Sequence, residues 1–135
     1  MRLPRFLMPR TVVSAHCDLP CGVYDPAQAR IEAESIKGIM EKYQANTDPE
    51  FRTRAIMIKE ERAQLVKHHL WVLWTDYFKA PHFEKYPQLH TLFNEATKLA
   101  GASGVKGSLD PDVVDQLIAK IDEIAAIFAE TKAAA

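Results

Sequence analysis

Three Asp-Pro pairs divide this chain of 135 residues and mark where helices begin. They are Asp25-Pro26, Asp48-Pro49 and Asp110-Pro111. An aspartate before a helix accepts hydrogen bonds from the unpaired backbone N–H groups of the first turn, and proline suits the first helical position because it has no N–H. Tyr86-Pro87 offers a fourth proline, without a good cap. The sequence therefore predicts four helices.

Apolar residues recur at the helical period after each of these starts. The predicted helices run from Pro26 to Gln44, Pro49 to Asp76, Pro87 to Ala100 and Pro111 to Lys132. No segment alternates as a strand does, and the loops are short, so we expect an all-α fold, an antiparallel four-helix bundle over residues 25–135. The residues expected on the inner faces are Ile31, Ile36, Ile39, Met40 and Tyr43; Phe51, Ala55, Ile58, Leu65, Val72 and Leu73; Leu89, Leu92, Phe93, Ala96 and Leu99; and Val114, Leu117, Ile118, Ile121, Ile124, Ala125 and Phe128.

The charge balance and the apolar runs exclude two classes of partner. The formal net charge is -1, whereas a nucleic-acid binder needs a basic surface to replace condensed counterions. No apolar run approaches the roughly 20 residues that span a bilayer. We therefore expect neither a nucleic acid nor a membrane as a partner.

Residues 1–15 have the composition of a removable leader. They contain three arginines and no acidic residue, and they end in the small residues Val13-Ser14-Ala15. A secretory signal also needs an apolar stretch of about 7–15 residues, which Pro4 and Pro9 interrupt here. We expect this leader to be cut off after Ala15 by a separate peptidase, and the protein to stay in the cytoplasm.

The chain has two cysteines, Cys17 and Cys21, and none elsewhere. A disulfide closing so short a loop restricts the unfolded chain little, so the pair favours metal or redox chemistry. The Cys-x-x-x-Cys spacing alone is a weak signal, which also fits half of a structural zinc site or two thiols without a role.

Cleavage after Ala15 would make His16 the amino terminus and change what these residues can bind. A free α-amine loses its proton near neutral pH, and a metal can displace that proton. The amine, the Cys17 amide nitrogen and the Cys17 sulfur are spaced for two adjacent chelate rings, and Cys21 can add a second thiolate after the turn at Pro20. Two nitrogens and two sulfurs in a plane favour Ni(II) or Cu(II) over tetrahedral zinc. The His16 imidazole can reach an axial position.

The segment from His16 to Tyr24 resembles the nickel hook of nickel-containing superoxide dismutases, with the pattern His-Cys-x-x-Pro-Cys-Gly-x-Tyr. The resemblance continues through Lys67-His68-His69 and through Asp76 to Pro87. It covers nearly all of His16 to Lys132 and weakens in the loop from Gly101 to Leu109.

This resemblance implies an enzyme that disproportionates superoxide to dioxygen and hydrogen peroxide by cycling between Ni(III) and Ni(II). It implies one nickel ion per chain, held in a hook at residues 16–24, and a homohexamer of four-helix bundles. The implied ligands are the amine and imidazole of His16, the amide nitrogen and sulfur of Cys17, and the sulfur of Cys21. The uncleaved precursor would be folded but inactive.

The resemblance also implies roles for residues around the metal. It places Glu32 and Arg62 beside the His16 imidazole, Tyr24 and Tyr77 beside the open face of the metal, the backbone N–H of Asp18 toward the incoming ligand, and a cis peptide bond before Pro20. Lys67 and Lys79 are candidates for attracting the anionic substrate. The remaining histidines are interpreted as structural or interfacial: His68, His69, His82 and His90.

Two other classes of function remain open from the residues alone. A non-enzymatic helical bundle could bind nickel or zinc for storage or delivery through the same His16, Cys17 and Cys21. A structural interaction module could instead carry a disulfide between the two cysteines. Redox silence of the metal-loaded protein would favour the first, and absence of free thiols and of metal would favour the second.

Overall fold

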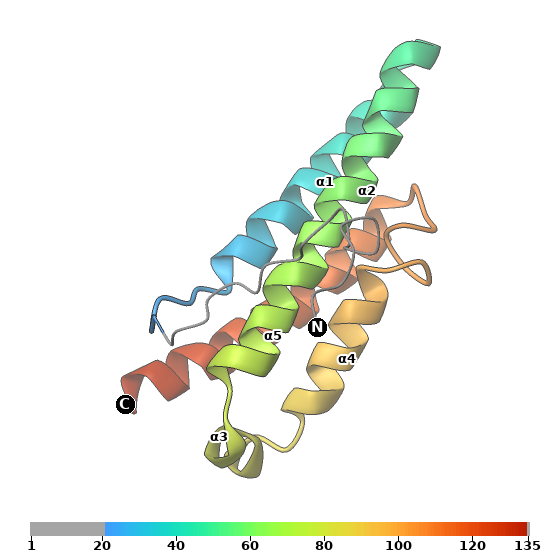
Figure 1. Ribbon diagram of the computed structural model, residues 1–135. Coiled ribbons are helices and arrows are strands. Elements are labelled where there is room, and N and C mark those ends of the chain that lie inside the picture. The colour runs from blue at the N-terminus through green and yellow to red at the C-terminus, as the bar shows by residue number, and fades with distance from the viewer. Residues whose placement is uncertain (1–20, 135) are drawn as a thin grey trace, which may run out of the picture.

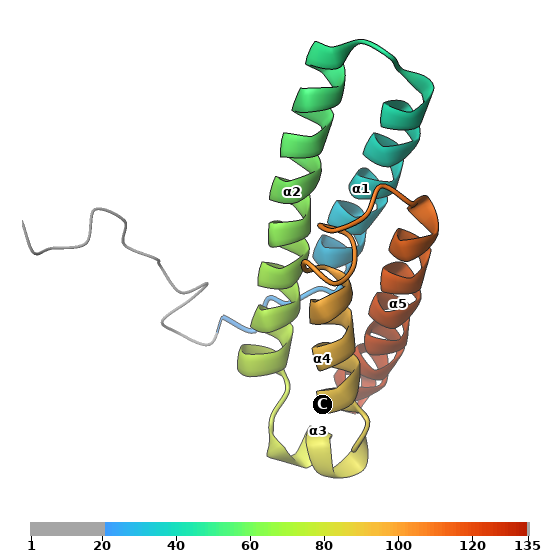
Figure 2. The ribbon, with the colours of Figure 1, turned by 90° about the vertical axis from the view of Figure 1, so that its right-hand side faces the viewer.

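The structure, a computed structural model, describes residues 21–134. Four long helices form a bundle, and a short helix closes one of its ends (Figures 1 and 2). The described residues contain no strand, so the predicted all-α class is confirmed. The elements in chain order are α1 (Ala27–Ala45), α2 (Pro49–Val72), the π-helical turn η2 (Leu73–Tyr77), α3 (Ala80–Lys85), α4 (Leu89–Leu99) and α5 (Pro111–Ala133).

The long helices pack as neighbours around one core. Helix α1 packs against α2 and α5, and α4 packs against α5 and α2. Short connections make consecutive long helices antiparallel, and the α1–α2 hairpin extends beyond the other two helices at one end (Figure 2). None of the helices within residues 21–134 is long and apolar enough to cross a membrane.

The three predicted aspartate caps are present. The Asp25 carboxylate accepts a hydrogen bond from the Ala27 N–H at 2.9 Å. Asp48 accepts from the N–H groups of Glu50 and Phe51 at 3.3 and 3.2 Å, and Asp110 accepts from the Asp112 N–H at 3.0 Å. Three helices begin within one residue of their predicted positions, just after Asp25, Asp48 and Asp110. These local hydrogen bonds explain that agreement.

Three features of the chain from the end of α2 to the start of α4 differ from prediction. The second helix does not run uniformly to Asp76, because its last turn widens into η2, where the Phe78 N–H donates to the Leu73 carbonyl five residues back at 3.0 Å. The stretch after it forms the short helix α3, with Pro81 in its first turn. Helix α4 then begins at Leu89, two residues after the predicted start.

Two isoleucines predicted on inner faces are exposed. Ile31 is 59% exposed and Ile58 is 37% exposed. Alanines occupy the faces of α1 and α2 that pack together, because small side chains let two helix backbones approach closely. The fully buried residues of these two helices are Ala29, Ala33, Ile36, Met40, Ala63, Val66 and Leu70.

Ion pairs on the surface join α5 to its neighbours. Lys37 contacts Asp115 at 2.7 Å, Arg30 contacts Asp122 at 2.8 Å, and Lys120 contacts Glu95 at 3.1 Å. The hydrogen bond that Lys37 donates to Asp115 raises the pKa of Lys37, and the one that Lys120 donates to Glu95 raises the pKa of Lys120. Exposed pairs of this kind contribute little to stability, so the apolar core and the loop contacts carry most of it.

A buried lysine fixes the loop between α4 and α5. The Lys59 side chain is 4% exposed, and its ammonium group donates to the carbonyls of Val105, Lys106 and Ser108 at 2.9, 3.0 and 2.8 Å. The exposed carboxylate of Glu60 lies 3.3 Å away. The loop therefore depends on α2 for its conformation.

Replacing this lysine should destabilise the fold. Lys59→Met keeps the length of the side chain but leaves three carbonyls without their charged donor, and we expect the free energy of unfolding to fall by about 2–4 kcal/mol. Urea unfolding of the full chain measures this change. The exposed Lys98→Met on α4 is the control, expected within about 0.5 kcal/mol of the original chain. Equal effects of the two substitutions would contradict this role of Lys59.

Candidate functional site

The predicted site residues fall into two groups. His16, Cys17, Asp18 and Pro20 lie outside the described residues, as does the leader. The structure describes Cys21, Tyr24, Glu32, Arg62 and Tyr77. No group of three or more histidine, cysteine, aspartate or glutamate side chains capable of holding a metal occurs within residues 21–134.

The segment from Cys21 to Tyr24 turns beside the start of α1. The Cys21 side chain is exposed, and its sulfur accepts a hydrogen bond from the Val23 N–H at 3.5 Å. Gly22 has a φ of +71°, a left-handed conformation that glycine adopts without strain. The Gly22 carbonyl accepts a hydrogen bond from Lys132 Nζ at 3.3 Å, so the end of α5 holds this turn in place.

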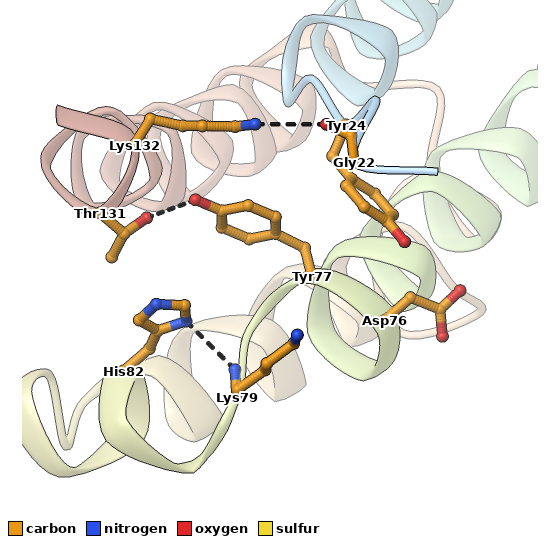
Figure 3. Close-up of a pocket in the computed structure, with 8 residues that line it drawn as sticks. All are labelled: Gly22, Tyr24, Asp76, Tyr77, Lys79, His82, Thr131 and Lys132. Atoms are coloured by element: carbon orange, nitrogen blue, oxygen red, sulfur yellow. Dashed lines mark hydrogen bonds between the residues drawn. The ribbon is translucent and has the colours of Figure 1, made fainter. Parts of the chain in front are cut away.

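A pocket of about 370 Å³ lies beside this turn. Four parts of the chain form it: the N-terminal segment, η2, the start of α3 and the last turns of α5 (Figure 3). Its lining residues are Gly22, Tyr24, Asp76, Tyr77, Lys79, His82, Thr131 and Lys132.

The two tyrosines assigned to the site lie together. The Tyr24 and Tyr77 rings have centroids 5.6 Å apart, at an angle of 56°. The Tyr77 ring also packs against Phe128 at 4.5 Å and is stacked with His82 at 5.8 Å. Because η2 ends at Tyr77, the wide last turn of the helix places this side chain between α3 and α5 (Figure 3).

Two lysines give the pocket positive charge. Lys79 lines it, and Lys132 lies above the Tyr77 ring, with its ammonium 5.6 Å from the ring centroid. Lys67, the other predicted candidate, does not line the pocket and instead lies over the Trp71 ring at 5.3 Å. Sequence reasoning missed Lys132 and Thr131, because 110 positions separate Lys132 from Gly22 and no local pattern marks the contact.

The carboxylate of Glu32 accepts two hydrogen bonds from Nη1 of Arg62. The two N–O distances are 3.1 and 3.3 Å. The Glu32 side chain is 15% exposed and that of Arg62 is 37% exposed. This partly buried pair links α1 to α2, and one guanidinium nitrogen makes both contacts, so Glu32 keeps capacity to accept a further donor.

The described histidines contact aromatic rings and the backbone. His82 accepts a hydrogen bond through Nδ1 from the Lys79 N–H at 3.1 Å. His90 accepts from Trp74 Nε1 at 3.0 Å and stacks on Phe83 at 4.0 Å. His68 and His69 meet edge to face, with centroids 5.6 Å apart.

The comparisons with known proteins agree with one another. A family model described as "Nickel-containing superoxide dismutase" matches residues 11–132. The nickel superoxide dismutase of Streptomyces coelicolor is 59% identical over 132 residues, which are 98% of this chain and 99% of that protein. That of Streptomyces seoulensis is 61% identical with the same coverage.

Solved structures show the same architecture. A native nickel superoxide dismutase structure superposes with a TM-score of 0.83 at 61% identity, covering 87% of this chain and 98% of the solved chain. The family match over most of the sequence, the high identity and the shared helical bundle lead to one conclusion. This chain belongs to the nickel-containing superoxide dismutases, oxidoreductases that use a nickel cofactor to disproportionate superoxide.

Proposed function

We propose that this chain is the precursor of the enzyme, and that removal of residues 1–15 creates its metal site at His16. The observation that carries this proposal is the position of Cys21. Its exposed thiol lies in a turn next to the pocket that contains Tyr24 and Tyr77, and the residues between it and Ala15 include the other predicted ligands.

The length of the solved relatives supports cleavage at this position. The match to the native solved structure takes up 98% of that chain but only 87% of this one, which is about 117 residues. The alignment with the Streptomyces coelicolor protein is longer, at 132 residues. Three further solved relatives carry substitutions of a histidine at the first position, an aspartate at the third and a tyrosine at the ninth. Counted from His16, this chain has His16, Asp18 and Tyr24 at those positions.

The donor set of the hook fits nickel. The residues that would hold nickel are His16 through its amine and imidazole, Cys17 through its amide nitrogen and sulfur, and Cys21 through its sulfur. This mixture of nitrogen and thiolate donors suits nickel. Nickel bound there would supply one-electron redox chemistry between Ni(III) and Ni(II), by which two superoxide anions and two protons give one dioxygen and one hydrogen peroxide. The Val23 N–H that donates to the Cys21 sulfur helps to orient this ligand.

The pocket is the proposed approach for superoxide. Lys79 and Lys132 provide positive charge for an anion, and the rings of Tyr24 and Tyr77 narrow the space beside the hook. Water held by the tyrosine hydroxyls can fill the remaining volume. The backbone N–H of Asp18, a residue of the same hook, is a further proposed donor to the incoming superoxide.

The Glu32–Arg62 pair is proposed to orient the imidazole of His16. A carboxylate that accepts the second N–H of a metal-bound imidazole fixes the ring and its tautomer. Glu32 is partly buried and keeps an acceptor position beyond its contacts with Arg62. Arg62 would then hold Glu32 in the orientation that His16 needs.

The proposal includes assembly of the chain into a homohexamer and its residence in the cytoplasm. Large apolar side chains exposed on α1 and α2 suit contacts with further copies of the chain, as in the proposed homohexamer. A separate peptidase would remove the leader, and the interruption of its apolar stretch supports cytoplasmic residence. The exposed apolar residues are Ile31 on α1 and Ile56, Met57, Ile58 and Trp71 on α2, with Val23 in the segment before α1.

Activity should require a free amine at His16. We expect a chain that begins at His16 to show nickel-dependent superoxide dismutase activity after reconstitution with Ni(II). The same chain retaining Ala15 should show almost none, because its first amine lies one residue too far from Cys17 to form the chelate. Equal activity in the two preparations would rule out the proposed role of the amine.

Removing the charge of Glu32 should weaken metal binding. We expect Glu32→Gln to lower the affinity for nickel by about 10–100-fold, as losses of residues that orient metal ligands do. Competition with a chelator measures the affinity in the chain that begins at His16. Glu41→Gln, an exposed position on the same helix, is the matched control. Unchanged affinity in Glu32→Gln would contradict the proposed contact with His16.

The lysines of the pocket should accelerate encounter with superoxide. We expect kcat/KM to fall as ionic strength rises, because salt screens the attraction of an anion. Lys132→Gln should lower kcat/KM at low salt and flatten this dependence, whereas Lys67→Gln should do neither. If kcat/KM depends on ionic strength to the same extent in Lys132→Gln and Lys67→Gln, Lys132 does not attract superoxide to the pocket.

A further inference from the structure

Thr131 is a buried polar residue that the proposed mechanism does not use. It lies near the end of α5, and its side chain is 5% exposed. Its Oγ1 atom lies 2.7 Å from the Tyr77 hydroxyl and donates to the Phe128 carbonyl at 2.8 Å. Figure 3 shows the Tyr77 hydroxyl directed at Thr131, with both residues at the wall of the pocket.

These two contacts fix which hydroxyl donates. The Phe128 carbonyl has no hydrogen, so its bond with Thr131 uses the single hydroxyl hydrogen of the threonine. Thr131 can then take part in the second bond only as an acceptor. Tyr77 is therefore the donor in its 2.7 Å contact with Thr131.

We propose that Thr131 is a positioning residue for the reaction, which acts by holding the Tyr77 hydroxyl in one orientation. Stacking on His82 and tilted packing against Phe128 fix the plane of the Tyr77 ring, and the hydrogen bond to Thr131 fixes the direction of the Tyr77 O–H. This inference rests on the proposed function, because it assumes that Tyr77 acts at the pocket.

The direction of the hydrogen bond determines what Tyr77 offers to a bound molecule. Its proton is directed to Thr131, so its oxygen can only accept a hydrogen bond from the pocket. It therefore suits water or hydrogen peroxide, which carry protons. Lys79 and Lys132, which line the same pocket, can still donate to the superoxide anion.

A double-mutant cycle on the nickel-loaded enzyme tests this role. Thr131→Val keeps the shape of the side chain and removes the hydroxyl, and we expect kcat/KM to fall about fivefold. In the Tyr77→Phe background the same substitution should change kcat/KM by less than about 1.5-fold, because the hydroxyl through which it acts is gone. Thr131→Ser, which retains the hydroxyl, should restore the activity. The same factor in both backgrounds would overturn the proposal.

Unfolding of the metal-free full chain gives a second readout that does not depend on activity. Thr131→Val and Tyr77→Phe should show a coupling of about fivefold in the unfolding equilibrium constant, the value of one hydrogen bond. Thr53→Val is the matched control, because Thr53 makes a similar hydrogen bond to the Pro49 carbonyl at 2.8 Å near the start of α2, at the opposite end of this helix from Tyr77. It should show no coupling with Tyr77→Phe.

The two readouts separate failure of this inference from failure of the proposed function. If Tyr77→Phe leaves kcat/KM unchanged, the proposed role of Tyr77 in the reaction is wrong. The proposed role of Thr131 in positioning Tyr77 for the reaction is then wrong as well. Coupling in unfolding would in that case show only that the hydrogen bond exists. If Tyr77→Phe lowers kcat/KM but Thr131→Val has no effect, the function stands and the role of Thr131 is wrong. Absence of coupling in unfolding would show that the bond contributes nothing.

Discussion

The packing of the Tyr77 ring against the last turns of α5 is the contact on which the pocket depends. The ring touches Phe128 on α5, His82 on α3 and Tyr24 in the N-terminal segment, so one side chain joins three distant parts of the sequence. The widened turn η2 makes this possible, because an extra residue in the hydrogen-bonded ring changes where the next side chain points. The departure of η2 from regular α-helix geometry therefore places Tyr77 where the pocket forms.

The sequence predicts the helices well where the signal is local. Asp25, Asp48 and Asp110 cap their helices through bonds to the next two or three residues, and such bonds depend on adjacent positions only. The inner faces were harder to predict, because alanines in α1 and α2 pack between the helices while the larger Ile31 and Ile58 are exposed. The short helix α3 and the turn η2 have no periodic pattern that would identify them.

The candidate site also has a part that local sequence predicts and a part that only the fold brings together. The hook is a contiguous pattern, so a short segment is enough to reveal the resemblance and to name Cys21 and Tyr24. Thr131 and Lys132 reach the pocket only because the bundle brings the end of α5 to the start of α1, and no spacing in the sequence encodes that meeting. Glu32 and Arg62 do form a contact, but pattern alone could not distinguish their pair from other surface charges.

The buried ammonium of Lys59 recognises the loop between α4 and α5 through main-chain carbonyls alone. Every amino acid supplies such a carbonyl, so the side chains of this loop can diverge between relatives without loss of the contact. Gly104 is an exception, since a Cβ there would lie 2.0 Å from the Leu99 carbonyl oxygen. The conformation of this loop therefore depends on its main chain and on Gly104, and its other side chains are not needed for the contact with Lys59.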